Sequence, residues 1–336
     1  MVNHTKENVL STRLELSRSI KGFGFVPSMK DKDFSNCIET VKNALRFHSD
    51  SFYPINCDQR SLAMYLHLYE KGIAALPNRD EQRISRIFVK KDLQYSVQVN
   101  NIEHVIVRSS RSGLDFEHTY NEIYGMEHHL QMFTEFLFNP SVGYTTCRPD
   151  RTGTGLKASI LLHLPAIAKT NSLNAISKTA QERNLLLRPA FVEKKATNSA
   201  LFLLENRFAS GMNEHDLIGT AYDMICEICS AEDQARIKYI QGSPDSGLSK
   251  ANTAFRQLKD CNAINEAQFM NLLSDIRFAI ECGMFSALSS VKADELLYKG
   301  MNGGIIKDKI KVDPKLSVDV LRSKLIREYL HREETH

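Results

Sequence analysis

The sequence predicts a mixed fold of strands and helices, followed by a mainly helical region beyond about residue 245. Two patterns support this prediction. Between residues 84 and 107 hydrophobic residues alternate with polar ones, which is typical of paired antiparallel strands that bury one face. Elsewhere hydrophobic residues recur every three or four positions, which is typical of amphipathic helices. With 336 residues, the chain is long enough for about two domains.

Strands are predicted from the alternation of side chains. The first is an extended segment that starts at residue 9 and places Ser11, Arg13 and Glu15 on one face. A polar connector over residues 189–199 joins the last two strands, and such a loop is a natural place for ligand-binding groups. The other predicted strands contain Ile87 and Val89, Tyr95 to Val99, Val105 and Val107, residues 185–188 and residues 200–204.

Helices are predicted from the hydrophobic period and from residues that favour helix ends. Asn213 is expected to cap one helix together with Asp216, and Gly72 and Gly283 are expected to end two others. A proline ends a third, at Asn139-Pro140. The predicted helices cover residues 33–48, 60–71, 115–138, a segment that begins at 213, residues 265–282 and residues 317–331.

The most distinctive stretch runs from residue 142 to residue 168 and joins a polar turn to a hydrophobic run. Gly153 and Gly155 allow a positive φ and a close approach of the backbone. Positive charge surrounds this turn, on Arg148, Arg151 and Lys157. The combination suits an anionic ligand. A plain hairpin whose cations stay in water is the alternative.

Composition argues against several classes of protein. Lys and Arg number 43 against 40 acidic residues, and a net charge of +3 gives no support for binding nucleic acid. Seven cysteines without the spacing of a small disulfide-bonded domain indicate reduced thiols and a cytoplasmic protein. The longest hydrophobic run, residues 160–168, is too short to cross a membrane. No metal site is expected at His128 and His129, because adjacent helical positions face apart.

Several motifs occur in a recognisable order. Gly143-Tyr144 is followed by Gly-Thr-Gly-Leu-Lys-Ala-Ser at residues 153–159 and by His-Leu-Pro-Ala at residues 163–166. This set resembles the signature region of the ATP:guanidino phosphotransferases, and most closely that of the bacterial protein-arginine kinases. Further stretches are similar to the same family: residues 10–18, 99–104 and 188–194, and, in the helical region, residues 272–282 and 318–330.

The resemblance implies an α+β catalytic domain over residues 1–240, with an antiparallel sheet flanked by helices. A small helical domain similar to a phosphoarginine-binding domain would cover residues 248–336, after a linker at residues 241–247. The family transfers the γ-phosphate of ATP to a guanidinium group, so the resemblance implies ATP and Mg²⁺ as cofactors. Protein arginine or a small guanidino compound would be the acceptor. Such kinases are often homodimers.

The resemblance also assigns residues to roles. The catalytic carboxylates would be Glu193 and Glu103, and phosphoarginine would bind at Asp319 and Arg322. The resemblance implies that the nucleotide phosphates would be held by Ser11, Thr12, Arg13, Lys157, Ala158, Ser159 and Arg188. Arg148, which stands at the place of the family's cysteine, and Arg151 are expected as further phosphate-binding cations that could substitute for missing arginines.

The chain departs from the family pattern at positions that bear on catalysis. Glu15 and Ile106 stand where arginines are expected, and Asn101 and Ile102 stand where glutamates are expected. Losing a general base typically costs ~10²- to 10⁴-fold in rate, and losing an arginine on a transferring phosphoryl group costs roughly 10³- to 10⁵-fold. These departures favour an alternative: a catalytically weak or inactive family member that binds nucleotide or phosphoarginine and acts as a regulatory partner.

Overall fold

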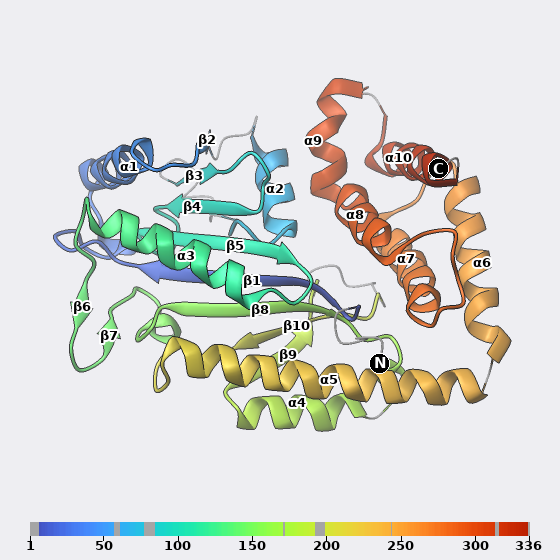
Figure 1. The fold of residues 1–336 in the computed structure, drawn as a ribbon. Helices are drawn as coiled ribbons and strands as arrows, with labels where there is room; N and C mark the ends of the chain where they lie inside the picture. The colour runs from blue at the N-terminus through green and yellow to red at the C-terminus, as the bar shows by residue number, and fades with distance from the viewer. Residues whose placement is uncertain are drawn as a thin grey trace.

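The computed structural model describes residues 7–56, 61–76, 85–170, 172–191, 199–242, 244–312 and 316–334 (Figure 1). Its centre is an eight-stranded sheet in the order β2-β3-β4-β5-β1-β8-β10-β9, in which every neighbouring pair is antiparallel. The strands are β1 (Val9–Arg18), β2 (Tyr53–Asn56), β3 (Arg86–Val89), β4 (Tyr95–Val99), β5 (Val105–Ser112), β8 (Leu156–His163), β9 (Leu185–Pro189) and β10 (Leu201–Asn206). A separate hairpin pairs β6 (Phe138–Asn139) with β7 (Gly143–Tyr144).

Helices surround this sheet and make up the C-terminal region. They are α1 (Asp31–Arg46), α2 (Leu62–Glu70), α3 (Phe116–Gln131), α4 (Ser172–Glu182), α5 (Glu214–Gly242), α6 (Pro244–Asp260), α7 (Glu266–Glu281), α8 (Ser290–Gly300), α9 (Asn302–Val312) and α10 (Val318–Glu334). The predicted α+β fold, an antiparallel sheet flanked by helices with a helical C-terminal region, is confirmed.

Two hydrophobic cores lie on opposite faces of the sheet. On one face, Leu14 and Leu16 of β1 pack with hydrophobic side chains of α1, α3 and α5. In Figure 1, α3 crosses β5 and β1 on this side. On the other face, Leu161 of β8 and Leu203 of β10 pack with the C-terminal helices, including Phe269 of α7. The helical region therefore covers one end of a sheet face, and a third, smaller core packs Tyr65 and Leu68 of α2 with Ile87 of β3.

Several helices begin or end where the sequence predicts. Asn213 accepts a 2.8 Å hydrogen bond from the backbone N–H of Asp216, and Asn265 begins α7 with a capping box. Gly72 and Gly283 have φ values of +78° and +68°, as expected for glycines that follow helices.

One predicted helix boundary is wrong, and the secondary structure of the predicted linker differs from the expectation. The helix predicted to reach residue 138 ends at Gln131, because residues 135–137 pair with residues 19–21 through bonds such as Lys21 N–H to Glu135 O (2.9 Å). The predicted linker over residues 241–247 is mostly helical: α5 continues to Gly242, and α6 begins at Pro244. Proline is tolerated in the first turn of a helix, where its missing N–H would have no helical partner.

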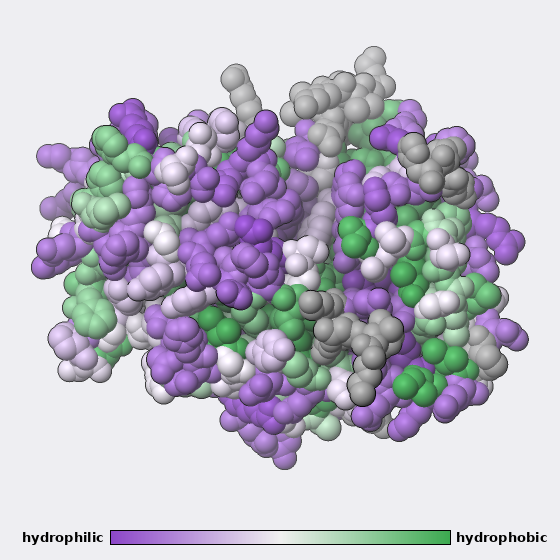
Figure 2. Space-filling model, in the orientation of Figure 1, coloured by the Kyte–Doolittle hydropathy of each residue, from purple (hydrophilic) through white to green (hydrophobic). Residues whose placement is uncertain are grey.

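Hydrophilic side chains cover most of the face shown in Figure 2, and hydrophobic ones are spread over it in small groups. This distribution is ordinary for a protein whose large hydrophobic side chains fill buried cores. In the described part of the chain, no helix is long and hydrophobic enough to cross a membrane.

Candidate functional site

A charged pocket lies on the sheet face that carries the odd-numbered residues of β1. Four cationic side chains line it, each from a different strand: Arg13 from β1, Arg108 from β5, Lys157 from β8 and Arg188 from β9. The carboxylates of Glu15 and Glu205 line it as well. We call these six residues the cation pocket. Ser159, Tyr69 and Gly72 complete part of its wall.

The strand register sets a row of alternating charge across the pocket. Glu15 pairs directly with Arg108 of β5 on one side and with Lys157 of β8 on the other. Nε of Arg108 donates a 2.7 Å hydrogen bond to the Glu15 carboxylate. Burial raises the pKa of Glu15, but Arg108, Lys157 and Arg151 together outweigh burial and lower that pKa below its ordinary value. Glu15 is therefore ionised at neutral pH.

Glu205 neutralises the other side of the pocket. Its carboxylate accepts hydrogen bonds from Arg188 Nε and Nη2 at 2.9 and 3.3 Å, and Lys157 Nζ lies 3.2 Å away. Burial raises the pKa of Glu205, but Arg188 and Lys157 lower it below its ordinary value. Two carboxylates thus compensate three of the four cations.

Arg13 is held in a different way. Its guanidinium donates to Ser11 Oγ at 3.1 Å, to the Glu70 carbonyl oxygen at 3.5 Å and to the Tyr298 hydroxyl oxygen at 3.2 Å. Gly72 makes room for this side chain, because a Cβ atom there would lie 2.4 Å from Arg13 Cδ. These contacts orient the guanidinium without neutralising its charge.

The structure brings some of the predicted phosphate-binding residues together and separates others. Arg13, Lys157, Ser159 and Arg188 all line the cation pocket. Thr12 and Ala158 do not, since alternation turns them to the opposite face of the sheet. Thr12 is fully buried and donates a 2.7 Å hydrogen bond to Gly113 O, and Ala158 is part of the hydrophobic core.

The cations of the central turn lie outside the pocket lining. Arg148 Nη2 pairs with Asp150 at 2.7 Å, and Arg151 lies 3.5 Å from the same carboxylate. The two glycines of this turn have positive φ, as predicted, but they are required by packing against other backbone segments. A Cβ at Gly155 would lie 2.6 Å from Ser17 O, and one at Gly153 would lie 2.5 Å from Ala209 O.

Glu103, an expected catalytic carboxylate, does not line the cation pocket. It is 1% exposed and accepts hydrogen bonds from the backbone N–H groups of Cys147 and Arg148 at 2.9 and 3.0 Å. Burial raises its pKa even though these two N–H groups favour the ionised form. Its contacts hold the central turn in place. The other expected catalytic carboxylate, Glu193, lies outside the described residues.

The two residues expected to bind phosphoarginine form an ion pair. Nη1 of Arg322 donates to Asp319 at 2.7 Å. Arg322 is completely buried and also donates to the carbonyl oxygens of Gly300 and Ile264, both at 2.7 Å. In this arrangement Arg322 joins α10 to the turn between α8 and α9.

Sequence reasoning missed Arg108 and Glu205. Arg108 lies two residues after Ile106 on the same strand, so both side chains point to one face of the sheet. Arg108 thus brings an arginine into the pocket, although Ile106 stands at the position where an arginine was expected. Glu205 was detectable as the one acidic residue in the hydrophobic run Leu201–Asn206. Neither residue belongs to a motif that the family resemblance points to.

The pocket has a volume of about 210 Å³, below the roughly 300–1,000 Å³ of typical ligand sites. As it stands, it can take phosphate groups rather than a whole nucleotide. Cations on a shared face are suited to bind phosphates, and the carboxylates are suited to hold a guanidinium or to complete the coordination of a phosphate-bound Mg²⁺.

Comparisons with known proteins agree with this architecture. The chain is 25% identical to the protein-arginine kinase of Clostridium acetobutylicum over 330 residues, which are 96% of each protein. It is 26% identical to that of Bacillus cereus strain AH187 over 300 residues, which are 86% of this chain and 82% of the relative.

Solved structures share the fold. The structure of lombricine kinase matches 69% of this chain and 68% of its own, with a TM-score of 0.61 and 17% identity. The substrate-free duplicated taurocyamine kinase of Schistosoma mansoni matches 78% of this chain and 43% of its own, also with a TM-score of 0.61, at 18% identity.

Family models match both parts of the chain. Residues 249–336 match the model of the protein-arginine kinase McsB C-terminal domain. Residues 32–235, more than half of the chain, match the ATP:guanido phosphotransferase C-terminal catalytic domain. This chain belongs to the ATP:guanido phosphotransferase family.

Proposed function

We propose that this protein binds ATP with its phosphates in the cation pocket and transfers the γ-phosphoryl group to the guanidinium of a protein arginine. The observation that carries the proposal is the convergence of four cationic side chains, from four strands, with two carboxylates on one face of the sheet. The relatives named protein-arginine kinase, which match nearly the whole chain, support a protein arginine as the acceptor.

In phosphoryl transfer the protein mainly positions the reactants and neutralises charge. Arg13, Arg108, Lys157 and Arg188 would hold the phosphates. With ATP bound, Mg²⁺ would supply positive charge that offsets part of the negative charge on the phosphates. Among the described residues, no group of three or more His, Cys, Asp or Glu side chains could hold a metal ion. Since Mg²⁺ usually binds through phosphates and one or two carboxylates, we infer that it would enter with the nucleotide and that Glu15 would be the carboxylate of the pocket to hold it.

The acceptor side requires a carboxylate. A protonated guanidinium has no free lone pair, so a nitrogen must lose a proton as it attacks. The new bond forms between this nitrogen and the γ-phosphorus, and the bond from the γ-phosphorus to the bridging oxygen breaks with ADP as leaving group. We assign this proton to a carboxylate of the pocket. Among the described residues the candidate is Glu205, because its two cationic partners, Arg188 and Lys157, can turn to the phosphates of ATP and leave the carboxylate available.

One feature of the pocket favours a second candidate function. Glu15 and Glu205 already pair with Arg108, Lys157 and Arg188, so phosphates must compete with carboxylates for these cations. A member of the family that binds nucleotide with little turnover, and acts as a regulatory partner, would be compatible with such a pocket.

Phosphate transfer from labelled ATP separates the two. The purified protein is incubated with ATP, Mg²⁺ and either free arginine or an unfolded protein, and acid-labile phosphate is measured. We expect labelling of the unfolded protein, and we expect Arg188→Ala to abolish it. If no label is transferred while ATP still raises the melting temperature, the proposal of catalysis is wrong and the second candidate stands.

A further inference from the structure

The C-terminal helical region contributes a side chain to the environment of the cation pocket. Tyr298 of α8 is half-buried, and its hydroxyl oxygen accepts a 3.2 Å hydrogen bond from Nη2 of Arg13. The two residues are 285 positions apart in the sequence. The Tyr298 ring packs against the hydrophobic core of the helical region. Arg13 is thus the pocket cation whose orientation depends on a helix outside the sheet.

Arg13 also differs from the other pocket cations in its charge balance. Arg108 pairs with Glu15, and Arg188 and Lys157 pair with Glu205. Within the described part of the chain, the partners of Arg13 are neutral oxygens only. The charge of Arg13 is therefore available to an incoming phosphate without displacement of a carboxylate. The orientation of its guanidinium then determines how well it can bind that phosphate.

Neighbouring contacts fix the position of Tyr298. Arg322 Nε donates a 2.7 Å hydrogen bond to Gly300 O, two residues after the tyrosine. At the start of α9, the Gly303 N–H donates to both carboxylate oxygens of Glu70, at 3.1 and 3.0 Å. In Figure 1, α9 stands beside α2, the helix that carries Glu70. Since the carbonyl oxygen of Glu70 also accepts from Arg13, one segment contacts both the helical region and the pocket.

We propose that Tyr298 is a positioning residue for the phosphate-binding guanidinium of Arg13, and that phosphate binding in the pocket is thereby coupled to α8. The inference rests on the proposed function, because it takes phosphate as the ligand of the pocket. Coupling is reciprocal. A phosphate that binds Arg13 in the orientation held by Tyr298 strengthens that contact, and a shift of α8 that breaks the contact weakens the binding of phosphate.

The test removes single hydroxyl groups from the full chain. Tyr298→Phe deletes the acceptor for Arg13, and Tyr329→Phe is the matched control, since its hydroxyl donates within the helical region to Lys292 O and Glu295 at 3.2 and 2.9 Å. Dissociation constants are measured for ATP with Mg²⁺ and for inorganic pyrophosphate. We expect Tyr298→Phe to weaken the binding of both probes about threefold to tenfold and Tyr329→Phe to leave both unchanged.

A double-mutant comparison separates positioning from a merely structural role. If Tyr298 acts through Arg13, Tyr298→Phe has no further effect on pyrophosphate binding in an Arg13→Ala background. An equal loss in both backgrounds would overturn the inference, and so would unchanged affinity in Tyr298→Phe when the unmodified protein binds ATP.

The two probes also distinguish the inference from the proposed function. If the unmodified protein binds pyrophosphate but not ATP, the proposed function fails, and the pyrophosphate measurements still decide the role of Tyr298. If the unmodified protein binds neither probe, both proposals are wrong.

Discussion

The Glu15 carboxylate accepts a 2.7 Å hydrogen bond from Nε of Arg108 in the middle of the cation pocket. Glu15 is a carboxylate where the family resemblance leads us to expect an arginine. Arg108 is an arginine two residues beyond Ile106, which is another position where an arginine is expected. Glu205 repeats the arrangement with Arg188 and Lys157. The pocket therefore has the cations for phosphate binding together with anions that occupy them.

Replacing Glu205 by glutamine tests this competition. The change keeps the size of the side chain and removes its charge, so Arg188 and Lys157 lose their anionic partner. We expect Glu205→Gln to bind ATP about tenfold more tightly, which corresponds to ~1.4 kcal/mol. Turnover should fall by roughly 10²- to 10⁴-fold if Glu205 accepts the guanidinium proton. Calorimetric titration and single-turnover labelling measure the two effects separately.

The control for this variant is Glu227→Gln. Glu227 pairs with Arg183 at 2.7 Å on the surface of α5 and does not line the pocket. It should change neither affinity nor turnover. Unchanged or weaker ATP binding in Glu205→Gln would show that Glu205 does not compete with phosphate.

Glu103 is expected to stabilise the central turn rather than to act on substrate. In Glu103→Gln the amide group can accept from one of the backbone N–H groups of Cys147 and Arg148 but presents its own NH₂ to the other. We expect a loss of roughly 1–3 kcal/mol in the free energy of unfolding, measured by chemical denaturation. Label transfer per folded molecule should stay within a few-fold of that of the unmodified protein.

Glu135→Gln controls for the loss of a carboxylate, because Glu135 is exposed and pairs only on the surface with Lys21. If Glu103→Gln instead lowered label transfer a hundredfold or more and left the free energy of unfolding unchanged, this result would support the catalytic role that the resemblance implies.

Much of the fold could be predicted from periodicity because local and tertiary preferences agree there. The alternating residues around Val97 and Val107 form β4 and β5, and the capped segment after Asn265 forms α7. The prediction failed after Gln131, where the hydrophobic period continues but residues 135–137 pair with residues 19–21. A pairing between segments so far apart leaves no trace in a local pattern.

The site could be predicted only in part, for a related reason. Alternation placed Arg13 and Glu15 on one face, and the motifs pointed to Lys157 and Arg188. The contribution of Arg108 depends on the register of β5 against β1, which no single segment specifies. The contact between Arg13 and Tyr298 depends on how the helical region docks on the sheet.

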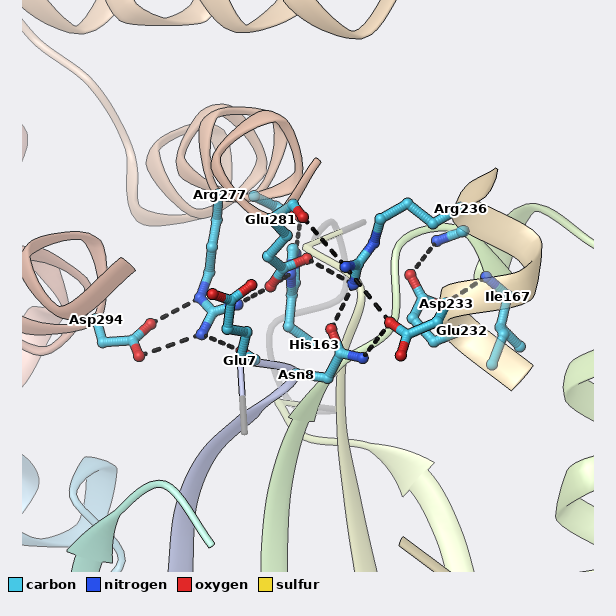
Figure 3. Close-up of polar contacts among 12 residues, drawn as sticks. Glu7, Asn8, His163, Ile167, Glu232, Asp233, Arg236, Arg277, Glu281 and Asp294 are labelled. Carbon is cyan, nitrogen blue, oxygen red and sulfur yellow. Dashed lines mark hydrogen bonds and ion pairs between the residues drawn. The ribbon is translucent and has the colours of Figure 1, made fainter. Parts of the chain in front are cut away.

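A buried cluster beside α7 predicts a pH dependence of stability (Figure 3). His163 is 1% exposed; its Nδ1 lies 2.9 Å from Glu281 and its Nε2 lies 2.7 Å from Ser274 Oγ. Burial, followed by the charges of Arg277, Arg236 and Lys169, holds the pKa of His163 well below its usual range. The neutral ring fits these contacts, since Nδ1–H can donate to Glu281 while Nε2 accepts from the serine.

The sign of the effect follows from this lowered pKa. Below about pH 6.5 the unfolded chain takes up a proton on this histidine that the folded protein does not. The folded state should therefore lose up to ~1.4 kcal/mol of stability per pH unit as the pH falls below about 6.5. Urea unfolding between pH 7.5 and 5.5 measures the slope, which should be smaller in His163→Gln. The exposed His118 provides the control, and equal slopes in His163→Gln and the unmodified protein would contradict the assignment.

The packing of α9 on α2 predicts opposite outcomes for the same substitution at two glycines. A Cβ atom at Gly303 would lie 2.4 Å from the backbone N of His67 and 2.6 Å from its Cα, and a backbone cannot move aside as a side chain can. We expect Gly303→Ala to cost ~1–3 kcal/mol in the free energy of unfolding. Gly219 is exposed on α5, and a Cβ atom there would meet nothing within 4 Å apart from the neighbouring backbone of its own helix. Gly219→Ala should therefore stabilise the protein by roughly 0.5–1 kcal/mol.

Both substitutions replace glycine by alanine within a helix, so the intrinsic helix preference favours both, and the difference between them isolates the contact of α9 with α2. Denaturant unfolding of the two variants measures that difference. If Gly303→Ala were as stable as Gly219→Ala, α9 could not pack directly on the backbone of α2. The two helices would then lie farther apart than the 3.0 Å hydrogen bond from the Gly303 N–H to Glu70 indicates.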